Sequence, residues 1–375
     1  MSTRQACVGP VANERVVVAM SGGVDSSVAA AILIDQGYDV SGMMLRLWSE
    51  PGDGRENRCC TARALREARH VADSLGVPFR VVDCSGEFKA AVVDSFIEEY
   101  ARGRTPNPCI ACNRHIKFGY LRETAHAAGA SYLATGHYAR LRPINGTYRL
   151  TRAADSHKDQ SYFLYSLGQE ELRSALFPLG ELTKTQVRAV ASQRNLPTAQ
   201  RAESQDICFV RDRDYTRFLR SFAPHVFEPG LILDRDGREL GRHQGLPLYT
   251  IGQRRGIGIT WSEPLYVLEK DVARNVLVVG PAAQLGRDIF QVEDPSFVVG
   301  HPPSLPADVK VKIRSTAPAA DAILYGEGER KLTVRTAMPL RDVTAGQAAV
   351  FYRGEEVLGG GTIASSDRRQ GEWHR

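Results

Sequence analysis

The sequence lacks long apolar runs, internal repeats and a secretory start, and each absence excludes a class of protein. Its 375 residues contain no run of about 18 apolar residues, so no membrane-crossing helix is expected. Residues 1–13 do not place a charged segment before an apolar core, so no signal peptide is expected. Without a fixed-period repeat or a low-complexity tract, collagen-like, coiled-coil and wholly disordered chains are excluded.

Cysteine is scarce, and no strong charge of one sign is present. Seven cysteines, an odd number, do not indicate a disulfide scaffold, so a reducing cytoplasmic setting is expected, with any functional cysteine catalytic or metal-binding. Lys and Arg number 48 against 43 Asp and Glu, a net charge of +5 that permits a polyanionic partner without requiring one. The 43% hydrophobic and 24% charged content is that of a globular protein, and the length suggests two or three domains.

The first part of the chain alternates between strand-like and helix-like patterns. Short β-branched runs predict strands at 15–20, 38–48, 79–83 and 131–135, and helix-forming stretches lie at 26–36, 61–75 and 116–129. Phe88, Val92, Phe96 and Tyr100 recur every four residues and predict the buried stripe of a further helix. This alternation predicts an α/β fold with a doubly wound parallel sheet.

From Arg211 onward the pattern changes to short strands separated by turn residues. Residues 230–241 predict a hairpin with its turn at Asp236 and Gly237. Further strands are expected at 265–268, 276–279, 297–299, 309–314, 331–334 and 348–352. We therefore predict three domains: an α/β domain at 1–210, a small central domain at 211–284, and an all-β barrel or sandwich at 285–375.

A glycine-containing turn, Ser21-Gly22-Gly23-Val24-Asp25-Ser26, lies between the first predicted strand and helix. Its glycines let backbone N–H groups face outward, and the helix N-terminus favours an anion, so we predict a phosphate site. The Walker phosphate-loop pattern is absent. Asp25 suits an anion site only beside a cation, so it is expected to bind Mg²⁺. The string resembles the PP-loop of ATP pyrophosphatases, which implies cleavage of ATP to AMP and pyrophosphate.

Gly136 and His137 follow the strand predicted at 131–135, so they are expected at the carboxyl edge of the sheet, where ligands bind in such folds. Gly136 would let the nucleotide approach the backbone. A phosphate contact is one interpretation of His137, and a structural role, the commoner fate of a lone histidine, is the other.

Two cysteines are candidate nucleophiles. Residues 105–113 predict a loop stiffened by two prolines, with Cys112 just before a helix and beside basic residues that would lower the pKa of its thiol. Cys208 lies far along the chain, and two such thiols near an ATP site suggest sulfur transfer through a persulfide. The remaining cysteines, apart from Cys109, are expected to be buried structural residues: Cys7, Cys59, Cys60 and Cys84.

Metal binding is the alternative for these thiols. The pair Cys109 and Cys112 supplies two ligands, and no second pair stands at zinc-finger spacing. With Cys208 the pair would give three ligands of an iron–sulfur cluster, a minority hypothesis.

The chain resembles the bacterial tRNA 2-thiouridylase family through several motifs in one order. These are the PP-loop, Asn107-Pro108 with Cys112-Asn113, residues 158–164, 205–209, 243–245, 252–258 and 346–352. The resemblance implies a PP-loop domain, a central domain and a C-terminal β-barrel. It also implies ATP-dependent adenylation of uridine 34, the wobble base of tRNA, whose C2 oxygen is then replaced by sulfur. The tRNAs implied are those for Lys, Glu and Gln, and the sulfur donor would be a sulfur-carrier protein or a cysteine desulfurase.

The resemblance also implies roles for single residues. Cys112 matches the family's nucleophile, Cys208 its persulfide carrier, and the pair is expected to form a transient disulfide. The residues expected to bind ATP are Ala19, Met20, Ser21, Gly22, Gly23, Val24, Asp25, Ser26, Leu45 and Gly136. The residues expected to contact tRNA are Asn107, Pro108, Cys109, Lys158, Asp159, Gln160, Arg314 and Ser315.

The sequence departs from the family at two positions. Cys109 stands where the family often has Asp, and Ser315 stands where it tends to have Tyr, which removes a stacking contact with RNA. Arginines between 194 and 220, among them Arg201, Arg211, Arg213 and Arg217, have two interpretations, phosphate contacts or a solvated surface. Two other functions stay open at this point: a different ATP pyrophosphatase, such as an amidotransferase-linked synthetase, and an RNA-binding protein without activity.

Overall fold

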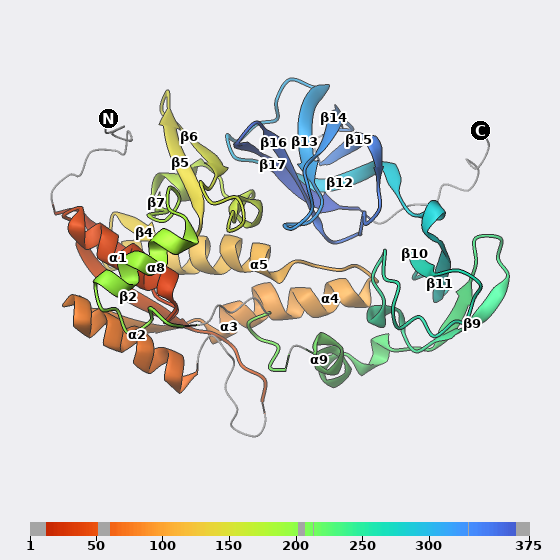
Figure 1. Cartoon of the computed structure of the whole chain (residues 1–375), viewed down its shortest axis with the longest axis horizontal. Coiled ribbons are helices and arrows are strands. Elements are labelled where there is room, and N and C mark those ends of the chain that lie inside the picture. Colours follow the sequence, from red (N-terminus) through yellow and green to blue (C-terminus); the bar gives the residue numbers. More distant parts are fainter. Residues whose placement is uncertain (1–12, 52–60, 202–206, 213, 329, 365–375) are drawn as a thin grey trace.

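A computed structural model describes residues 13–51, 61–201, 207–212, 214–328 and 330–364. Figure 1 shows a parallel sheet with helices on both sides at one end of the molecule, a small β unit at the other end, and a barrel beside them. Cys7, Cys59, Cys60 and Arg213, named above, lie outside the described residues.

The parallel sheet has the strand order β3-β2-β1-β4-β7. Its strands are β1 (Arg15–Ala19), β2 (Asp39–Arg46), β3 (Phe79–Asp83), β4 (Tyr132–Ala134) and β7 (Ala175–Leu176). Each neighbouring pair is parallel, and β1 pairs with β2 on one side and β4 on the other. The predicted doubly wound α/β fold is confirmed. The strand order reverses at β1, and a crevice opens for ligands at the carboxyl end of such a strand.

Helices predicted from composition flank this sheet. Helix α1 (Val24–Asp35) follows β1, and α2 (Ala62–Leu75) follows β2. Thr61 caps α2 by accepting from the backbone of Ala64 at 2.9 Å, and Gly76 ends the helix in the left-handed conformation with φ 68°. Further helical segments of this unit include α7 (Gln169–Arg173), α8 (Lys184–Gln193) and the 3₁₀ turn η3 (Ser161–Leu164).

The predicted stripe of Phe88, Val92, Phe96 and Tyr100 is buried, as expected. It lies on one continuous helical segment built from α3 (Ser85–Phe88), η1 (Lys89–Asp94) and α4 (Ser95–Ala101). A repeat of four exceeds the 3.6-residue turn of an α-helix, so a stripe at this spacing would drift around the helix. The π-helical geometry of η1 has a wider turn and brings the stripe back toward one face.

The prediction of a loop at 105–113 is wrong over most of that range. A helical segment begins at α5 (Pro108–Ala111) and continues through the π-helix η2 (Cys112–Leu121) and α6 (Arg122–Ala127). Pro108 is the first helical residue, where the missing N–H costs no hydrogen bond. Cys112 therefore lies inside the helix, about one turn from its N-terminus, and not before it.

The small β unit has the strand order β10-β11-β8-β9. Its elements are β8 (Gly230–Leu233), β9 (Glu239–His243), β10 (Leu265–Asp271), β11 (Val276–Pro281) and the 3₁₀ turns η5 (Leu246–Leu248) and η6 (Ala282–Gln284). The predicted hairpin is confirmed, since β8 and β9 are antiparallel and Gly237 has φ 84° in the turn. Helix α9 (Tyr215–Phe222) and the turn η4 (Pro224–Val226) precede this unit.

The C-terminal strands close into an antiparallel barrel, as the resemblance implied. The sheet order runs β12-β15-β14-β13-β16-β17, and β12 also pairs with β17. The strands are β12 (Arg287–Phe297), β13 (Ala307–Lys312), β14 (Ala320–Gly326), β15 (Lys331–Leu340), β16 (Ala348–Arg353) and β17 (Glu356–Ile363). Closure leaves β12 and β17 without an open edge between them.

A hairpin from the α/β unit extends this barrel sheet, which the sequence did not predict. Strands β5 (Ala139–Ile144) and β6 (Thr147–Arg152) pair with each other, and β6 pairs with β17. Tyr162 donates its hydroxyl hydrogen to the carbonyl of Ala348 at 2.9 Å, and one buried apolar cluster takes in residues of both units. The α/β unit and the barrel therefore share a core.

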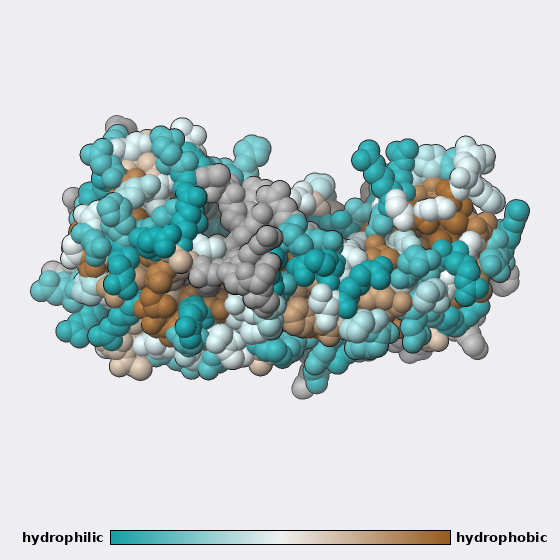
Figure 2. All heavy atoms as spheres, turned by 90° about the horizontal axis from the view of Figure 1, so that it is seen from below, coloured by the Kyte–Doolittle hydropathy of each residue, from teal (hydrophilic) through white to brown (hydrophobic). Residues whose placement is uncertain are grey.

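The described residues contain no helix that is both long and apolar enough to cross a membrane. In the space-filling view from below, hydrophilic side chains cover most of the described surface, and hydrophobic residues show in separate patches (Figure 2). Scattered exposed apolar side chains of this kind are normal for a globular protein.

Candidate functional site

The predicted phosphate loop joins β1 to the first turn of α1. Gly23 precedes the helix and has no side chain to cap it. The hydroxyls of Ser26 and Ser27 both donate to the carbonyl of Gly23, at 3.1 and 2.9 Å, and Ser26 Oγ accepts from the backbone N–H of Ser21 at 3.3 Å. The loop is thus held by its own serines, and the N–H groups of the first helical turn face a site suited to an anion.

Two glycines of this site allow close backbone approach. Gly22 has φ 71°, and a Cβ there would lie 2.7 Å from the carbonyl oxygen of Ala64. At Gly136 a Cβ would lie 2.9 Å from backbone atoms of Asp25 and Ser26. The sequence explained Gly136 by nucleotide approach, whereas the structure gives it a different task, letting the chain after β4 pack on the first turn of α1. Its contact with a nucleotide stays a prediction.

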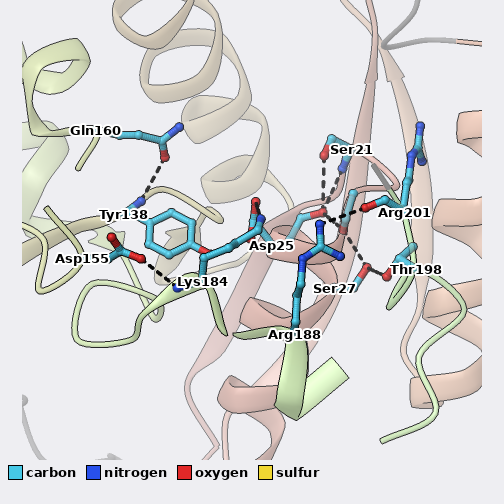
Figure 3. A network of polar contacts seen from close by, with 12 residues as sticks. Ser21, Asp25, Ser27, Tyr138, Asp155, Gln160, Lys184, Arg188, Thr198 and Arg201 are labelled. Atoms are coloured by element: carbon cyan, nitrogen blue, oxygen red, sulfur yellow. Dashed lines mark hydrogen bonds and ion pairs between the residues drawn. The ribbon is translucent and has the colours of Figure 1, made fainter. Parts of the chain in front are cut away.

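Asp25 stands at the centre of a polar network (Figure 3). Lys184 Nζ donates to both carboxylate oxygens of Asp25 at 2.8 Å, and Tyr138 donates its hydroxyl hydrogen to Oδ1 at 2.8 Å. Asp155 accepts from the backbone N–H of Lys184 at 2.9 Å, which lowers the pKa of Asp155. Gln160 accepts from the backbone N–H of Tyr138 at 3.0 Å. The network links the phosphate loop to residues 155–160.

Sequence reasoning missed Lys184. The available signal was a capping box, because Thr183 and Gln186 have the spacing that begins a helix, and the structure confirms it for α8. This places Lys184 in the first helical position, facing Asp25. Only the folded chain reveals that a lysine so far from the loop reaches it.

The donor set does not form a metal site. Asp25 already binds Lys184 and Tyr138, and within the described ranges no group of three or more His, Cys, Asp or Glu side chains could hold an ion. Mg²⁺ usually binds nucleotides mainly through phosphate oxygens and waters, so Asp25 as its ligand stays a prediction. Cys109, Cys112 and Cys208 are all described and do not assemble as three ligands of an iron–sulfur cluster.

The two candidate nucleophiles, Cys112 and Cys208, pack against the same apolar cluster. Cys112 and Cys208 are half-buried and pack against the cluster around Phe96, Phe209 and Phe218. Cys84 belongs to the buried core of this cluster, as predicted for a structural cysteine, and Cys109 is exposed. The fold therefore brings both thiols to one cluster. Cys112 also lies about one turn from the N-terminus of its helix.

His137 is buried beside Phe118 and Phe177. Its ring nitrogens lie 2.7 Å from Thr135 Oγ1 and 3.3 Å from Lys117 Nζ. Burial, reinforced by Lys117, lowers the pKa of His137 well below its usual value. A neutral, enclosed imidazole fits the structural interpretation better than a phosphate contact.

Asp159, one of the residues predicted to contact tRNA, lies near Lys312 of the barrel. Asn107 caps α5 by accepting from the backbone N–H of Cys109 at 3.2 Å. Lys312 of β13 donates to the carbonyl of Ser315 at 2.7 Å, and although burial lowers the pKa of Lys312, nearby Asp159 acts in the opposite direction. Asp159 and Ser315, far apart in sequence, therefore both lie near Lys312.

Several predicted contact residues also have structural partners. Asp159 accepts from the backbone N–H groups of Ala153 and Ser161, both at 3.1 Å. Arg314 donates to the carbonyl of Ile251 at 3.4 Å and to Thr344 Oγ1 at 3.3 Å, joining the small β unit to the barrel.

The remaining residues predicted to bind ATP lie in the loop or in strands beside it. Ala19 ends β1, Met20 and Val24 are buried, and Leu45 is half-buried near the end of β2.

Three of the arginines considered as phosphate contacts bind carboxylates of the protein itself. Arg201 contacts Glu67 and the carbonyl of Gly22, while Arg211 and Arg217 bind Glu50. They therefore hold the fold together around the site.

Beside Gly22 there is also a hollow of about 450 Å³. It is lined by Arg63, Glu67, Pro197, Thr198, Gln200 and Arg201.

Family models match successive parts of the chain. They are described as a tRNA methyl transferase HUP domain at residues 14–212, a tRNA methyl transferase PRC-barrel domain at 216–281 and an aminomethyltransferase beta-barrel domain at 287–363. The first of them alone spans more than half of the chain.

Curated relatives are similar over nearly the full length. A tRNA-specific 2-thiouridylase MnmA of Roseiflexus castenholzii is 49% identical, covering 93% of this chain and 99% of the relative. Proteins of the same name from Chloroflexus aurantiacus and Symbiobacterium thermophilum are 50% and 47% identical, over 93% and 94% of this chain. By this similarity the chain belongs to the family of tRNA-specific 2-thiouridylases.

Proposed function

We propose that the protein is an ATP-dependent tRNA sulfurtransferase that replaces the C2 oxygen of uridine 34 by sulfur. The products would be 2-thiouridine, AMP and pyrophosphate. The observation that carries the proposal is the gathering of Cys112 and Cys208 on one apolar cluster, against which Leu45 at the end of β2 also packs. Such a reaction needs both thiols near an anion site, and the predicted phosphate loop follows β1, which pairs with the strand β2 that carries Leu45.

In the first step, the uridine C2 oxygen attacks the α-phosphorus of ATP. The oxygen–phosphorus bond forms, the bond to pyrophosphate breaks, and the uridine loses its N3 proton. A poor leaving group thereby becomes AMP. The first turn of α1 and the loop from Ser21 to Ser26 would bind the phosphates, and Lys184 holds Asp25 of that turn through an ion pair. The residues present fit ATP.

In the second step, sulfur replaces AMP. The terminal sulfur of a Cys208 persulfide bonds to C2, and AMP leaves with the former uridine oxygen. The Cys112 thiolate then attacks the Cys208 sulfur, which breaks the persulfide bond, leaves sulfur on C2 and forms a Cys112–Cys208 disulfide. A cellular dithiol must reduce this disulfide before the next cycle, so we place the protein in the reducing cytoplasm.

The target base must leave the anticodon stack to reach these groups. We propose that residues 107–109, 158–160 and 314–315 contact the tRNA. Two contacts between the α/β unit and the barrel support this: Thr105, two residues before Asn107, donates to the carbonyl of Ala345, and Asp159 lies near Lys312 of β13. The substrates would be the tRNAs for Lys, Glu and Gln, and the persulfide would come from a sulfur-carrier protein or a cysteine desulfurase.

The test is direct formation of 2-thiouridine. The purified chain is incubated with ATP, a sulfide source and unmodified tRNA, and the nucleosides are separated and identified by mass. Cys112→Ser and Cys208→Ser are expected to lose the product, with Cys84→Ala, at a buried cysteine of the same cluster that has no proposed role, as the comparison. Absence of product from the wild type, with Cys112→Ser unchanged in every measurement, would refute the proposal.

Methyl transfer is a second candidate, because two of the matching models are described as tRNA methyl transferase domains. The same nucleoside analysis, run with S-adenosylmethionine in place of ATP and sulfide, would then give a methylated base. A different ATP pyrophosphatase would consume ATP without requiring both cysteines, and a binding protein would leave both ATP and tRNA unchanged.

A further inference from the structure

A turn of the barrel holds the backbone of Thr105 on both sides. The N–H of Thr105 donates to the carbonyl of Ala345 at 2.8 Å, and the carbonyl of Thr105 accepts from Gln347 Nε2 at 2.8 Å. Gly346 lies between them with φ 88°, and a Cβ there would be 2.8 Å from Thr105 N and 2.9 Å from Arg104 Cβ. The contact joins residues separated by most of the chain.

This turn, residues 345–347, has a fixed place in the barrel. The N–H of Gly346 donates to the carbonyl of Ile363 at 2.9 Å, and the N–H of Ile363 donates to the carbonyl of Gln347 at 2.8 Å. Ile363 is a buried residue at the end of β17. The turn cannot shift without disturbing the pairing of barrel strands.

A charged contact supports the same junction. Arg104 lies 2.9 Å from a carboxylate oxygen of Glu99 in α4 and 3.6 Å from one of Glu293 in β12. Its side chain is 17% exposed, so water screens these pairs little. Arg104 and Thr105 are therefore held by both the α/β unit and the barrel.

Thr105 stands two residues before Asn107, the N-cap of the helix that carries Cys112. The start of that helix is thus set by a contact with the barrel. We propose that Gly346 and Gln347 are positioning residues that hold Cys112 at its reacting place. The role of Cys112 itself rests on the proposed function.

The test compares Gly346→Ala with Gly300→Ala. Gly300 has nearly the same φ, 87°, but a Cβ there would meet nothing within 4 Å, so both variants carry the same backbone strain and only Gly346→Ala displaces Thr105. We expect Gly346→Ala to lose more thermal stability, because the contact of its Cβ with Thr105 adds to the shared strain, so kcat is compared at a temperature where both variants are folded. Gly346→Ala should lower kcat for 2-thiouridine formation by about ten- to a hundredfold, the scale of a misplaced reacting group. Gly300→Ala should leave kcat unchanged.

A second measurement reads the position of Cys112 without the reaction. The rate at which iodoacetamide alkylates Cys112 is followed by peptide mass spectrometry across pH, and its midpoint should shift in Gly346→Ala alone. Should Gly346→Ala fail to fold, Gln347→Met serves instead, because it keeps the side-chain size and removes the hydrogen bond to Thr105. Equal kcat and equal alkylation profiles in the test variant and Gly300→Ala would overturn the inference. A wild type that makes no 2-thiouridine would refute the proposed function, while the alkylation profiles would still decide on the positioning role.

Discussion

The carboxylate of Glu50 provides a sharp test of how the protein holds its units together. Its side chain is 2% exposed, accepts from Arg217 Nη1 and Nη2 at 3.0 and 2.9 Å, and lies 3.1 Å from Arg211 Nε. The hydrogen bond with Glu50, followed by one with Asp212, raises the pKa of Arg217. Glu50 follows β2, whereas Arg217 lies in α9, so the cluster joins the α/β unit to the segment that leads into the small β unit.

Glu50→Gln keeps the shape of the side chain and removes its charge. Loss of one partner from a buried ion pair costs about 3–5 kcal/mol. The cost here should be smaller, because the Arg217 side chain is 35% exposed and keeps Asp212 at 2.6 Å, and Arg211 keeps two backbone carbonyls. We expect about 2–3 kcal/mol in the free energy of unfolding.

Asp321→Asn is the matched control. Asp321 pairs with Lys310 at 2.7 Å, but the two side chains are 73% and 50% exposed, so its loss should cost less than about 1 kcal/mol. Urea unfolding followed by tryptophan fluorescence would measure both, since Trp48 packs on Phe218 and Phe222 of α9 and reports on this junction. If the two variants shift the urea midpoint equally, burial of the Glu50 cluster does not strengthen it and the reasoning fails.

Three further predictions concern the site and pH. Gly136→Ala should weaken binding of a non-hydrolysable ATP analogue at least about tenfold in calorimetry, because its Cβ would displace the first turn of α1. Gly86→Ala is the control, because a Cβ there would have no atom within 4 Å, and it should not change the affinity. Equal affinities of the two variants would contradict the packing argument. Burial lowers the pKa of His137 below its usual 6.5, so as the pH drops the unfolded state takes up the proton before the folded state does. The free energy of unfolding therefore falls below about pH 6.5. His137→Gln should reduce this loss of stability, measured by thermal melts at several pH values. Burial lowers the pKa of Lys270 from 10.5 to about 8. The buried charge therefore destabilises the folded state fully below pH 8, and this destabilisation fades as the pH rises toward 10.5. Lys270→Met should melt above the wild type at pH 7 and lose this advantage near pH 10, and a lower melting temperature at pH 7 would refute the prediction.

Features that depend on neighbouring residues could be predicted from the sequence. The stripe from Phe88 to Tyr100 and the turn between β1 and α1 are local patterns, because hydrophobic spacing and glycine geometry act within a few residues. The hairpin turn at Gly237 is local in the same way. Of these features, the turn between β1 and α1 positions the predicted phosphate loop.

Features that depend on distant contacts could not be predicted from the sequence. The two prolines before Cys112 suggested a loop, yet Pro108 is compatible with the first position of a helix and Asn107 caps it. Lys184 reaches Asp25 only through the packing of α8 on α1, and the arginines considered for RNA find carboxylates brought by the fold. Sequence reveals that a side chain is charged, while its partner is decided by tertiary structure.

The hairpin β5–β6 has a consequence for synthesis of the chain. Its strand β6 pairs at Glu356, near the C-terminal end, and Arg152 N–H donates to the carbonyl of Glu355 at 2.9 Å. Ribosomes deliver residues in order and upstream parts generally fold first. The hairpin must therefore wait, with one edge of β6 unpaired, until Glu355 and Glu356 have emerged. An early stop that removes β17 would leave not a shorter enzyme but an α/β unit with an exposed strand edge, a surface prone to aggregation.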